Sequence, residues 1–406
     1  MPGDRYDVIV VGAGIVGLAV AYKINLRYPD KTILVLEKEP EVATHQTGHN
    51  SGVIHSGIYY EPGSYKARNC VEGRRELVAF AREHGIKHDI CGKIIVATKS
   101  SELAHMHKVF NNGLQNGVEG IELINADQIR EIEPYCTGIE GIWVPCTGII
   151  DYADVARKYA ELITQQFEGS RVLTNYEVTG FEKHTDYTTV VTNQGAFNAK
   201  YIVTCGGLQS DRIAQKEGVK TDTTIVGFRG DYYDLTPQGK HKVKNLIYPV
   251  PNPIYPFLGV HFTSMINGDT ECGPNAVFVF KREGYGKTDF SFKDTVDAFS
   301  FLGTWKFFYK NWRFGLDEYR RAFSKKLFLK RLQSLIPSLE MDDIAPGRAG
   351  VRAMLLADEG KMIDDFKIEH NGNAIHILNA PSPAATASLA IGTQVQKMVD
   401  KYFKLN

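Results

Sequence analysis

DVIVVGAGIVGLAVAYKI, residues 7–24, is the stretch that decides the fold of this chain. Residues 8–11 form a short, β-branched apolar run that predicts a buried strand, and apolar residues at helical spacing begin directly after the glycines. Gly12, Gly14 and Gly17 stand between them in the order GxGxxG. In such a strand–turn–helix the first glycine permits the tight turn, the second lets the backbone approach a pyrophosphate, and the third lets helix and strand pack closely. The stretch therefore predicts a dinucleotide-binding domain.

A second strand and an acidic residue complete this pattern. Residues 31–36 read as the second strand, and Glu37 follows at the position where a carboxylate accepts hydrogen bonds from an adenosine ribose. The same carboxylate would repel a 2′-phosphate, which argues against NADP. Because no second complete GxGxxG occurs in the chain, we expect a single dinucleotide. The alternative is a glycine-rich turn in some other α/β protein.

Composition limits the function classes. A length of 406 residues suits about two domains, and 47 basic residues balance 47 acidic ones, so no overall field favours nucleic acid. The chain has no apolar run long enough to span a membrane, and its N-terminus enters the first strand too soon for a signal or transit peptide. The six cysteines lack metal-ligand spacing, so we expect reduced thiols and no metal.

The rest of the chain predicts a second, interleaved domain. Aromatic alternation indicates an antiparallel sheet, while other segments indicate a hairpin and further parallel strands. The expected sheet strands are 224–235, 255–263 and 276–281, the hairpin is 141–150, and the parallel strands are 172–178 and 201–205. We therefore predict an α/β fold, with a Rossmann-type domain interleaved with a mixed or antiparallel-sheet domain of α+β type.

The dinucleotide domain is expected to use both ends of the chain. Residues 44–60 form a polar loop after the second strand, where loops line the ligand crevice. Near the C-terminus, a strand at 375–378 and a small-residue loop at 379–385 precede a helix that we expect to begin at Thr386. The partial positive charge at the N-terminus of this helix would offer a second binding site for an anionic group.

Residues 296–332 allow two interpretations. The segment is rich in aromatic residues up to Trp312, and residues 320–332 carry six basic side chains. It is either a helical pair packed over the sheet with a solvated basic face, or an amphipathic surface that docks on anionic lipid.

Arg352 stands among apolar residues in a strand-like segment, 347–356. An arginine in such a place is usually paired, so it either forms a structural salt bridge or clamps a substrate carboxylate.

The chain resembles the D-amino-acid oxidase-like superfamily of FAD-dependent oxidoreductases, and within it the L-2-hydroxyglutarate dehydrogenase family. The resemblance is carried by HQTGHNSGVIHSGIYY, VTCGGLQSDRI, FRGDY, AGVRA and NAPSPAATASLAI, and it runs from residue 7 to the 390s. It implies FAD-dependent oxidation of L-2-hydroxyglutarate to 2-oxoglutarate, with electrons passed to quinone or a membrane carrier rather than NAD. It also implies a mitochondrial location in association with the inner membrane. The implied FAD-binding domain is 1–85, 147–222 and 345–406, and the implied substrate domain is 86–146 and 223–344.

The resemblance also suggests which residues act. His55 is the first choice for the base and His261 its rival or partner, because histidine suits proton transfer at neutral pH. Tyr59, Tyr60, Asn275 and Arg352 are expected at the substrate, with Arg229 or Lys281 as weaker candidates for its second carboxylate. The expected FAD contacts are Gly12, Ala13, Gly14, Ile15, Val16, Gly17, Glu37, Lys38, Thr47, His49, Asn50, Ser51, Gly52, Val178, Cys205, Gly206, Ser382, Pro383, Ala384, Ala385 and Thr386.

Two further alternatives stay open at this point. His49 is a candidate for a covalent bond to FAD, as some relatives use a histidine in a comparable loop. The competing functions are another FAD enzyme of glycerol-3-phosphate or amine type and a non-catalytic flavin-binding protein.

Overall fold

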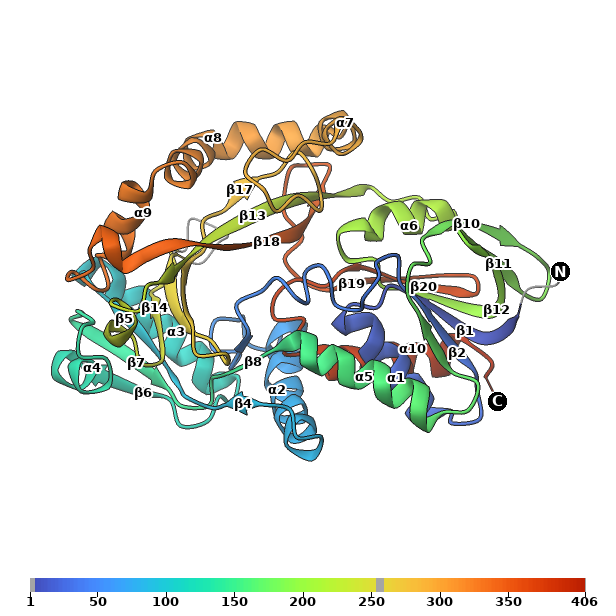
Figure 1. Ribbon diagram of the computed structural model, residues 1–406, viewed down its shortest axis with the longest axis horizontal. Helices are drawn as coiled ribbons and strands as arrows, with labels where there is room; N and C mark the ends of the chain where they lie inside the picture. The colour runs from blue at the N-terminus through green and yellow to red at the C-terminus, as the bar shows by residue number, and fades with distance from the viewer. Residues whose placement is uncertain (1–3, 253–258, 406) are drawn as a thin grey trace.

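The computed structural model describes residues 4–252 and 259–405, and the strands in these ranges form three sheets. The first is an eight-stranded sheet of the described chain, with a parallel centre in the order β20–β12–β1–β2–β9. It lies at one end of the molecule, near both chain termini (Figure 1). Its strands are β1 (Arg5–Val11), β2 (Ile33–Leu36), β9 (Arg171–Leu173), β10 (Val178–Lys183), β11 (Thr188–Thr192), β12 (Gly195–Thr204), β19 (Lys367–Asn371) and β20 (Ala374–Asn379).

Both faces of β1 are buried, which explains its unbroken apolar run. Val8 and Val10 pack into the core beneath the helices, whereas Ile9 and Val11 face a second core on the opposite side. Burial of each such side chain contributes about 1.5–3 kcal/mol. The covering helices are α1 (Ile15–Arg27), α5 (Tyr152–Gln166) and α10 (Ser388–Tyr402), flanked by α2 (Tyr65–Glu83), with α6 (Ser210–Glu217) after β12.

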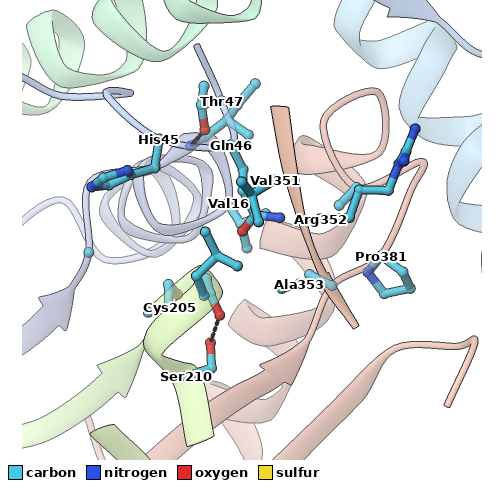
Figure 2. Close-up of a pocket in the computed structure, with 18 of the residues that line it drawn as sticks. Val16, His45, Gln46, Thr47, Cys205, Ser210, Val351, Arg352, Ala353 and Pro381 are labelled. Carbon is cyan, nitrogen blue, oxygen red and sulfur yellow. Dashed lines mark hydrogen bonds between the residues drawn. The ribbon is translucent and has the colours of Figure 1, made fainter. Parts of the chain in front are cut away.

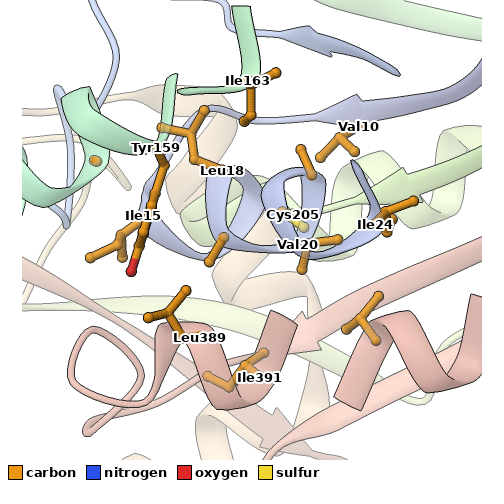
Figure 3. Packing of buried hydrophobic residues seen from close by; sticks show 14 of the residues in the cluster. Val10, Ile15, Leu18, Val20, Ile24, Tyr159, Ile163, Cys205, Leu389 and Ile391 are labelled. Carbon is orange, nitrogen blue, oxygen red and sulfur yellow. The ribbon is translucent and has the colours of Figure 1, made fainter. Parts of the chain in front are cut away.

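The small residues of α10 let it approach α1 closely. A Cβ on Gly392 would lie 2.7 Å from the carbonyl oxygen of Ala19. Around this contact, apolar side chains of α1, α5 and α10 interdigitate, as Figure 3 shows for Leu18, Tyr159 and Leu389. The N- and C-terminal parts of the chain therefore share one hydrophobic core.

The second sheet has nine strands within the described ranges and lies at the other end of the molecule (Figure 1). Its two longest strands, β13 and β18, pair in antiparallel register from Thr223↔Ala357 to Leu235↔Ile344. Its strands are β5 (Lys93–Ala97), β6 (Glu122–Asn125), β7 (Glu140–Val144), β13 (Thr223–Leu235), β14 (Leu246–Pro249), β15 (His261–Ser264), β16 (Thr270–Gly273), β17 (Val277–Phe278) and β18 (Ile344–Ala357). Because β18 belongs to this sheet, residues 345–357 pair with the substrate domain and not with the FAD domain, where the sequence analysis had placed them.

The remaining helices cover the second sheet. α7, α8 and α9 run along the outer edge of the molecule, over β13, β17 and β18 (Figure 1). Their bounds are α7 (Phe292–Ser300), α8 (Leu302–Ala322) and α9 (Lys325–Leu332); α3 (Leu103–Gln115) and α4 (Ala126–Ile132) accompany β6 and β7, and short 3₁₀ turns occupy Ser100–Glu102, Gly207–Gln209, Lys240–Lys242 and Met341–Asp343.

Two predicted strand features are wrong. Residues 141–150 are not a hairpin, because β7 pairs with β5 and β6 while β8 (Gly148–Ile150) joins β3 (Val53–Ile54) and β4 (His88–Asp89) in a small third sheet. Residues 172–178 are not one strand, because β9 ends at Leu173 and Val178 begins a new, antiparallel strand. Part of the predicted strand 255–263 lies outside the described residues.

Candidate active site

A cavity of about 1310 Å³ lies between the two large sheets. It is lined by the glycine turn, the loop 43–60, β18 and the loop after β20. Figure 2 shows Val16 and Thr47 beside Val351 and Arg352, which come from the two ends of the chain. This volume exceeds the roughly 300–1,000 Å³ of ordinary small-ligand pockets, which suits a dinucleotide with a small substrate beside it.

One part of the cavity, the glycine end, consists of Gly12, Gly14, Gly17, Glu37 and Thr47. Gly12 has a φ of +103°, and a Cβ on Gly17 would lie 2.0 Å from the Gly12 carbonyl oxygen, so both positions require glycine. A Cβ on Gly14, in contrast, would meet only the Thr47 hydroxyl, at 3.4 Å. Gly14 therefore leaves open space where a pyrophosphate would approach, and these residues fit FAD.

Side chains hold this turn in place. The Ala13 N–H donates to Glu37 Oε2 at 2.8 Å, and the Ile15 N–H at the start of α1 donates to Thr47 Oγ1 at 3.0 Å. Glu37 itself lines the cavity, and its role as a ribose ligand stays a prediction.

A charged cluster joins the two domains at the rim of this end. Lys38 forms ion pairs with Glu39 and with Glu283, the latter at 3.0 Å, and His45 Nε2 lies 2.8 Å from Glu39 Oε1. Glu39, His45 and Glu283 are close enough to share a metal ion. Because the Lys38 ammonium already forms ion pairs with both carboxylates, in the place where a cation would bind, we assign no metal to this cluster.

The opposite part of the cavity, the histidine end, consists of His55, Tyr59, Tyr248, His261 and Arg352. Burial is the main cause that lowers the pKa of His55 to about 3, followed by the charges of Lys93 and His261. Burial likewise lowers the pKa of His261 to about 4, with Arg352 and Lys93 acting in the same direction. Both imidazoles are therefore neutral at pH 7 and able to accept a proton.

Thr386 supports the loop that carries His55. Its hydroxyl accepts the His55 backbone N–H at 3.1 Å and lies 2.6 Å from the hydroxyl of the buried Tyr152. Thr386 does not line the cavity, and α10 begins two residues later, at Ser388. We therefore replace the predicted cofactor contact at Thr386 with a supporting role.

Of the residues predicted to bind the substrate carboxylates, some line the cavity and others lie behind its wall. Arg352, on β18, lines the cavity and donates from Nη1 to the Asn275 carbonyl oxygen at 3.5 Å. Asn275 lies behind the cavity wall, where its side-chain amide bonds to Asp231. Arg229 is buried in a salt bridge to Asp231, with Nε 2.7 Å from Oδ1.

These contacts correct part of the prediction. The side chain of Asn275 is fully engaged, and neither Arg229 nor the exposed Lys281 lines the cavity, so the sequence assigned all three wrongly to substrate contact.

The cavity brings together most of the predicted site residues. Besides the residues of the glycine end and the histidine end other than Tyr248, the predicted residues that line the cavity are Ile15, Val16, Lys38, His49, Asn50, Ser51, Tyr60, Val178, Cys205, Gly206, Ser382, Pro383, Ala384 and Ala385. Ala13 and Gly52 lie behind the wall; the Gly52 N–H donates to Asn50 Oδ1 at 2.8 Å within a turn.

Sequence reasoning missed Tyr232, Tyr248 and Lys66 in the lining and Lys93 behind it. Lys93 had one detectable signal: it is a lysine at the first position of a strand whose other residues, IIVA, are all apolar. Lys66 lies 2.6 Å from Asp364 in an ion pair, and it stands at the start of α2, shortly after the loop that ends at Tyr60.

Comparisons with known proteins agree with this geometry. The family model described as "FAD dependent oxidoreductase" matches residues 7–398. An L-2-hydroxyglutarate dehydrogenase of Indibacter alkaliphilus is 47% identical over 399 residues, covering 98% of this chain and 100% of that protein. The mitochondrial L-2-hydroxyglutarate dehydrogenase of Homo sapiens is 44% identical, covering 99% and 90% respectively.

The fold is also found among solved structures. The L-alpha-glycerophosphate oxidase of Mycoplasma pneumoniae, solved with FAD bound, matches with a TM-score of 0.80. The match covers 98% of this chain and 95% of the other at 23% sequence identity, so it supports the fold alone.

Proposed function

This chain belongs to the family of FAD dependent oxidoreductases, and from that premise we propose that it oxidises the C2 hydroxyl of L-2-hydroxyglutarate to the ketone of 2-oxoglutarate. The observation that carries the proposal is identity above 40%, over nearly the whole chain, to proteins named for this substrate. The cavity adds support, because it offers a dinucleotide cradle at one end and two neutral histidines with a nearby arginine at the other.

FAD would lie along the glycine end. Gly12, Gly14 and Thr47 would hold its pyrophosphate and Glu37 its ribose, while residues 382–385 would border the flavin. When bound, the flavin supplies the two-electron acceptor of the reaction.

We assign the hydroxyl proton of the substrate to His55, with His261 as its partner. Both imidazoles are neutral at pH 7, as a general base must be. Their low pKa values in the free protein make them weak bases, but a substrate that carries two carboxylates would raise both pKa values on binding.

Arg352 would bind one carboxylate through its guanidinium. A bidentate pair of this kind fixes orientation as well as charge, and each hydrogen bond to a charged group contributes about 1.5–3 kcal/mol. Tyr59 and Tyr60 line the cavity near the histidine end and remain candidates for the other oxygens.

We propose a quinone or a membrane-bound carrier as electron acceptor, reached by peripheral membrane contact. Among the described residues, no helix has both the length and the apolar character needed to cross a bilayer. The α7–α9 face, however, exposes a stripe of large apolar side chains at helical spacing on α8: Leu302 (60% exposed), Trp305 (55%), Tyr309 (85%), Trp312 (56%) and Leu316 (46%).

Basic side chains accompany this stripe. Lys306, Lys310, Arg313 and Arg320 stand on the same helix, which is the composition of helices that bind anionic lipid at the interface. The wild-type protein should float with anionic vesicles, and the triple variant W305S/Y309S/W312S should not. The matched control L26S alters an equally exposed leucine (49%) on α1 and should leave flotation unchanged. Wild-type protein that stays with the unbound fraction would contradict membrane contact.

A covalent bond between His49 and FAD is a separate proposal. His49 lines the cavity, its ring stacks on Tyr285 with centroids 4.1 Å apart, and its Nδ1 lies 2.9 Å from the Ala349 carbonyl oxygen. The hydrogen bond to Ala349 occupies Nδ1, so Nε2 is the ring nitrogen that would form a covalent bond to FAD. Flavin that stays with the acid-denatured polypeptide, and is lost in His49→Ala, would support the bond; full release would end it.

We also propose a mitochondrial location, on the strength of the human relative's name. A tagged chain expressed in its own cells should fractionate with mitochondria, and recovery in another fraction would contradict this.

The reaction is tested by its stoichiometry. Purified protein with L-2-hydroxyglutarate and a soluble quinone should form one 2-oxoglutarate per quinone reduced. Glycerol 3-phosphate and L-amino acids serve as competing substrates, and turnover of either in preference to L-2-hydroxyglutarate would overturn the proposal in favour of another activity on the same fold.

A further inference from the structure

Lys93 is a lysine buried in the centre of the substrate domain. It begins β5, pairs in backbone register with Leu246 of β14 and Val144 of β7, and its side chain is 0% exposed. Lysine is almost never fully buried without a counter-charge, because removing an ammonium from water is costly.

Aromatic rings, and no carboxylate, surround this ammonium. Its Nζ lies 4.6 Å from the ring centroid of Tyr59 and 4.8 Å from that of Tyr248. No Asp or Glu among the described residues lies within ion-pair distance of Lys93. Cation–π contacts offset only part of the cost of burial, so the charge still lacks an anion.

The same rings form the wall of the cavity. Tyr59 and Tyr248 both line it, and Tyr248 stacks on His261 with ring centroids 4.0 Å apart. The Tyr59 hydroxyl is buried and has no hydrogen-bond partner within the described part of the chain. A positive charge and an unpaired donor therefore stand together at the histidine end.

Two cations act on this end of the cavity. Arg352 and Lys93 both lower the pKa of His261, and Lys93 also lowers that of His55. Burial lowers the pKa of Lys93 itself to about 8, so at pH 7 most of it remains charged. A dicarboxylic acid bound here would bring two negative charges to two positive ones.

We propose that Lys93 is a specificity-determining residue, whose ammonium behind Tyr59 and Tyr248 provides the counter-charge for the second carboxylate of a dicarboxylic substrate, while Arg352 binds the first. This inference rests on the proposed function and deepens it. Lys93 takes the place of Arg229 and Lys281 as the candidate for the second carboxylate, because neither of those residues lines the cavity.

The test compares ligands that differ only in the second carboxylate. Binding of glutarate and of valerate to the flavin-loaded protein is measured by the shift in melting temperature, without turnover. The wild-type protein should prefer glutarate, and Lys93→Met, which keeps the length of the side chain, should lose about 10- to 100-fold in glutarate affinity. Its valerate affinity should stay within about twofold of wild type. Equal losses for both ligands, or no loss for glutarate, would overturn the proposal.

A second measurement uses the unaltered protein. Glutarate affinity should fall as pH rises through about 8 and beyond, because the Lys93 cation is lost, whereas valerate affinity should change little. The other groups near Lys93 do not lose or gain a proton in this range: burial lowers the pKa of His55 and His261 far below it, and it raises the pKa of Tyr59, Tyr248, Cys70 and Cys146. Lys93→Arg, which keeps the charge, should retain the preference for glutarate. Parallel pH curves for the two ligands would contradict the role of Lys93.

The two proposals fail in different ways. If L-2-hydroxyglutarate does not reduce the flavin but glutarate binding still depends on Lys93, the proposed substrate is wrong and the dicarboxylate subsite stands. If the flavin is reduced and Lys93→Met binds both ligands normally, only the inference about Lys93 falls.

Discussion

The glycine end and the histidine end of the cavity are built by different means. At the glycine end, the backbone of residues 12–17 makes the cradle, and contacts of 2.5 and 2.0 Å to a Cβ require glycine at Gly12 and Gly17. At the histidine end, side chains from β14, β15, β18 and the loop after β3 meet around a buried lysine. Under the proposed function, shape would hold the cofactor at one end, and buried charge would select the substrate at the other. Substitutions at the glycine end should therefore change folding and FAD binding, whereas substitutions at the histidine end should change reaction rate and substrate binding.

The largest expected effect concerns His55. His55→Ala should slow flavin reduction by about 100- to 10,000-fold, because a general base is lost, while FAD content stays normal. Stopped-flow reduction with L-2-hydroxyglutarate measures it, and His261→Ala is the matched comparison. A rate within about fivefold of wild type for His55→Ala would remove it as the base, and a larger loss in His261→Ala would transfer the role.

At the glycine end we expect a loss of folding rather than of chemistry. Gly17→Ala places a Cβ 2.0 Å from a backbone oxygen, so it should lower the free energy of unfolding by about 3 kcal/mol. Gly14→Ala meets only the Thr47 hydroxyl at 3.4 Å, so it should fold normally and bind FAD more weakly. Urea unfolding and flavin titration separate the two. Equal unfolding free energies for the two variants would show that the cradle is not held as described.

Arg352→Lys tests how the histidine end binds a substrate carboxylate. It keeps the charge but loses the planar fork, so the Michaelis constant for L-2-hydroxyglutarate should rise about 10- to 100-fold with stability little changed. Steady-state kinetics at saturating quinone measures the change. An unaltered Michaelis constant would mean that Arg352 is a structural residue.

The smallest effect is a dependence of stability on pH. Since the pKa of His261 is about 4 when folded and about 6.5 when unfolded, the unfolded chain binds the extra proton, and stability falls as pH drops below about 6.5. His261→Gln should therefore reduce the slope of unfolding free energy between pH 6 and 5 by up to about 1.4 kcal/mol per pH unit. An unchanged slope would contradict the buried, neutral state of this histidine.

The two ends also differed in how well the sequence predicted them. The glycine end follows from local spacing, since GxGxxG, the second strand and Glu37 lie within one βαβ unit, and the structure places each of them as predicted. The packing of α10 against α1 agrees with the expectation, drawn from the strand, loop and helix pattern near the C-terminus, that the dinucleotide domain uses both ends of the chain.

The histidine end depends on contacts between distant segments. Asn275 looked available because Asp231, its partner, stands 44 residues earlier in the chain. Thr386 looked like a cofactor contact because its bonds to His55 and Tyr152 arise only in the folded chain. The supposed hairpin at 141–150 divides between two sheets, since strand pairing there is decided by neighbours far away in sequence.

The central claim is that one cavity holds FAD beside L-2-hydroxyglutarate. The most direct measurement mixes the purified, flavin-loaded protein anaerobically with single substrates and follows the visible absorption band of oxidised flavin. The account predicts that L-2-hydroxyglutarate bleaches the band and that D-2-hydroxyglutarate, glycerol 3-phosphate and L-glutamate do not. A band that persists with L-2-hydroxyglutarate, or that another of these compounds bleaches instead, would contradict it.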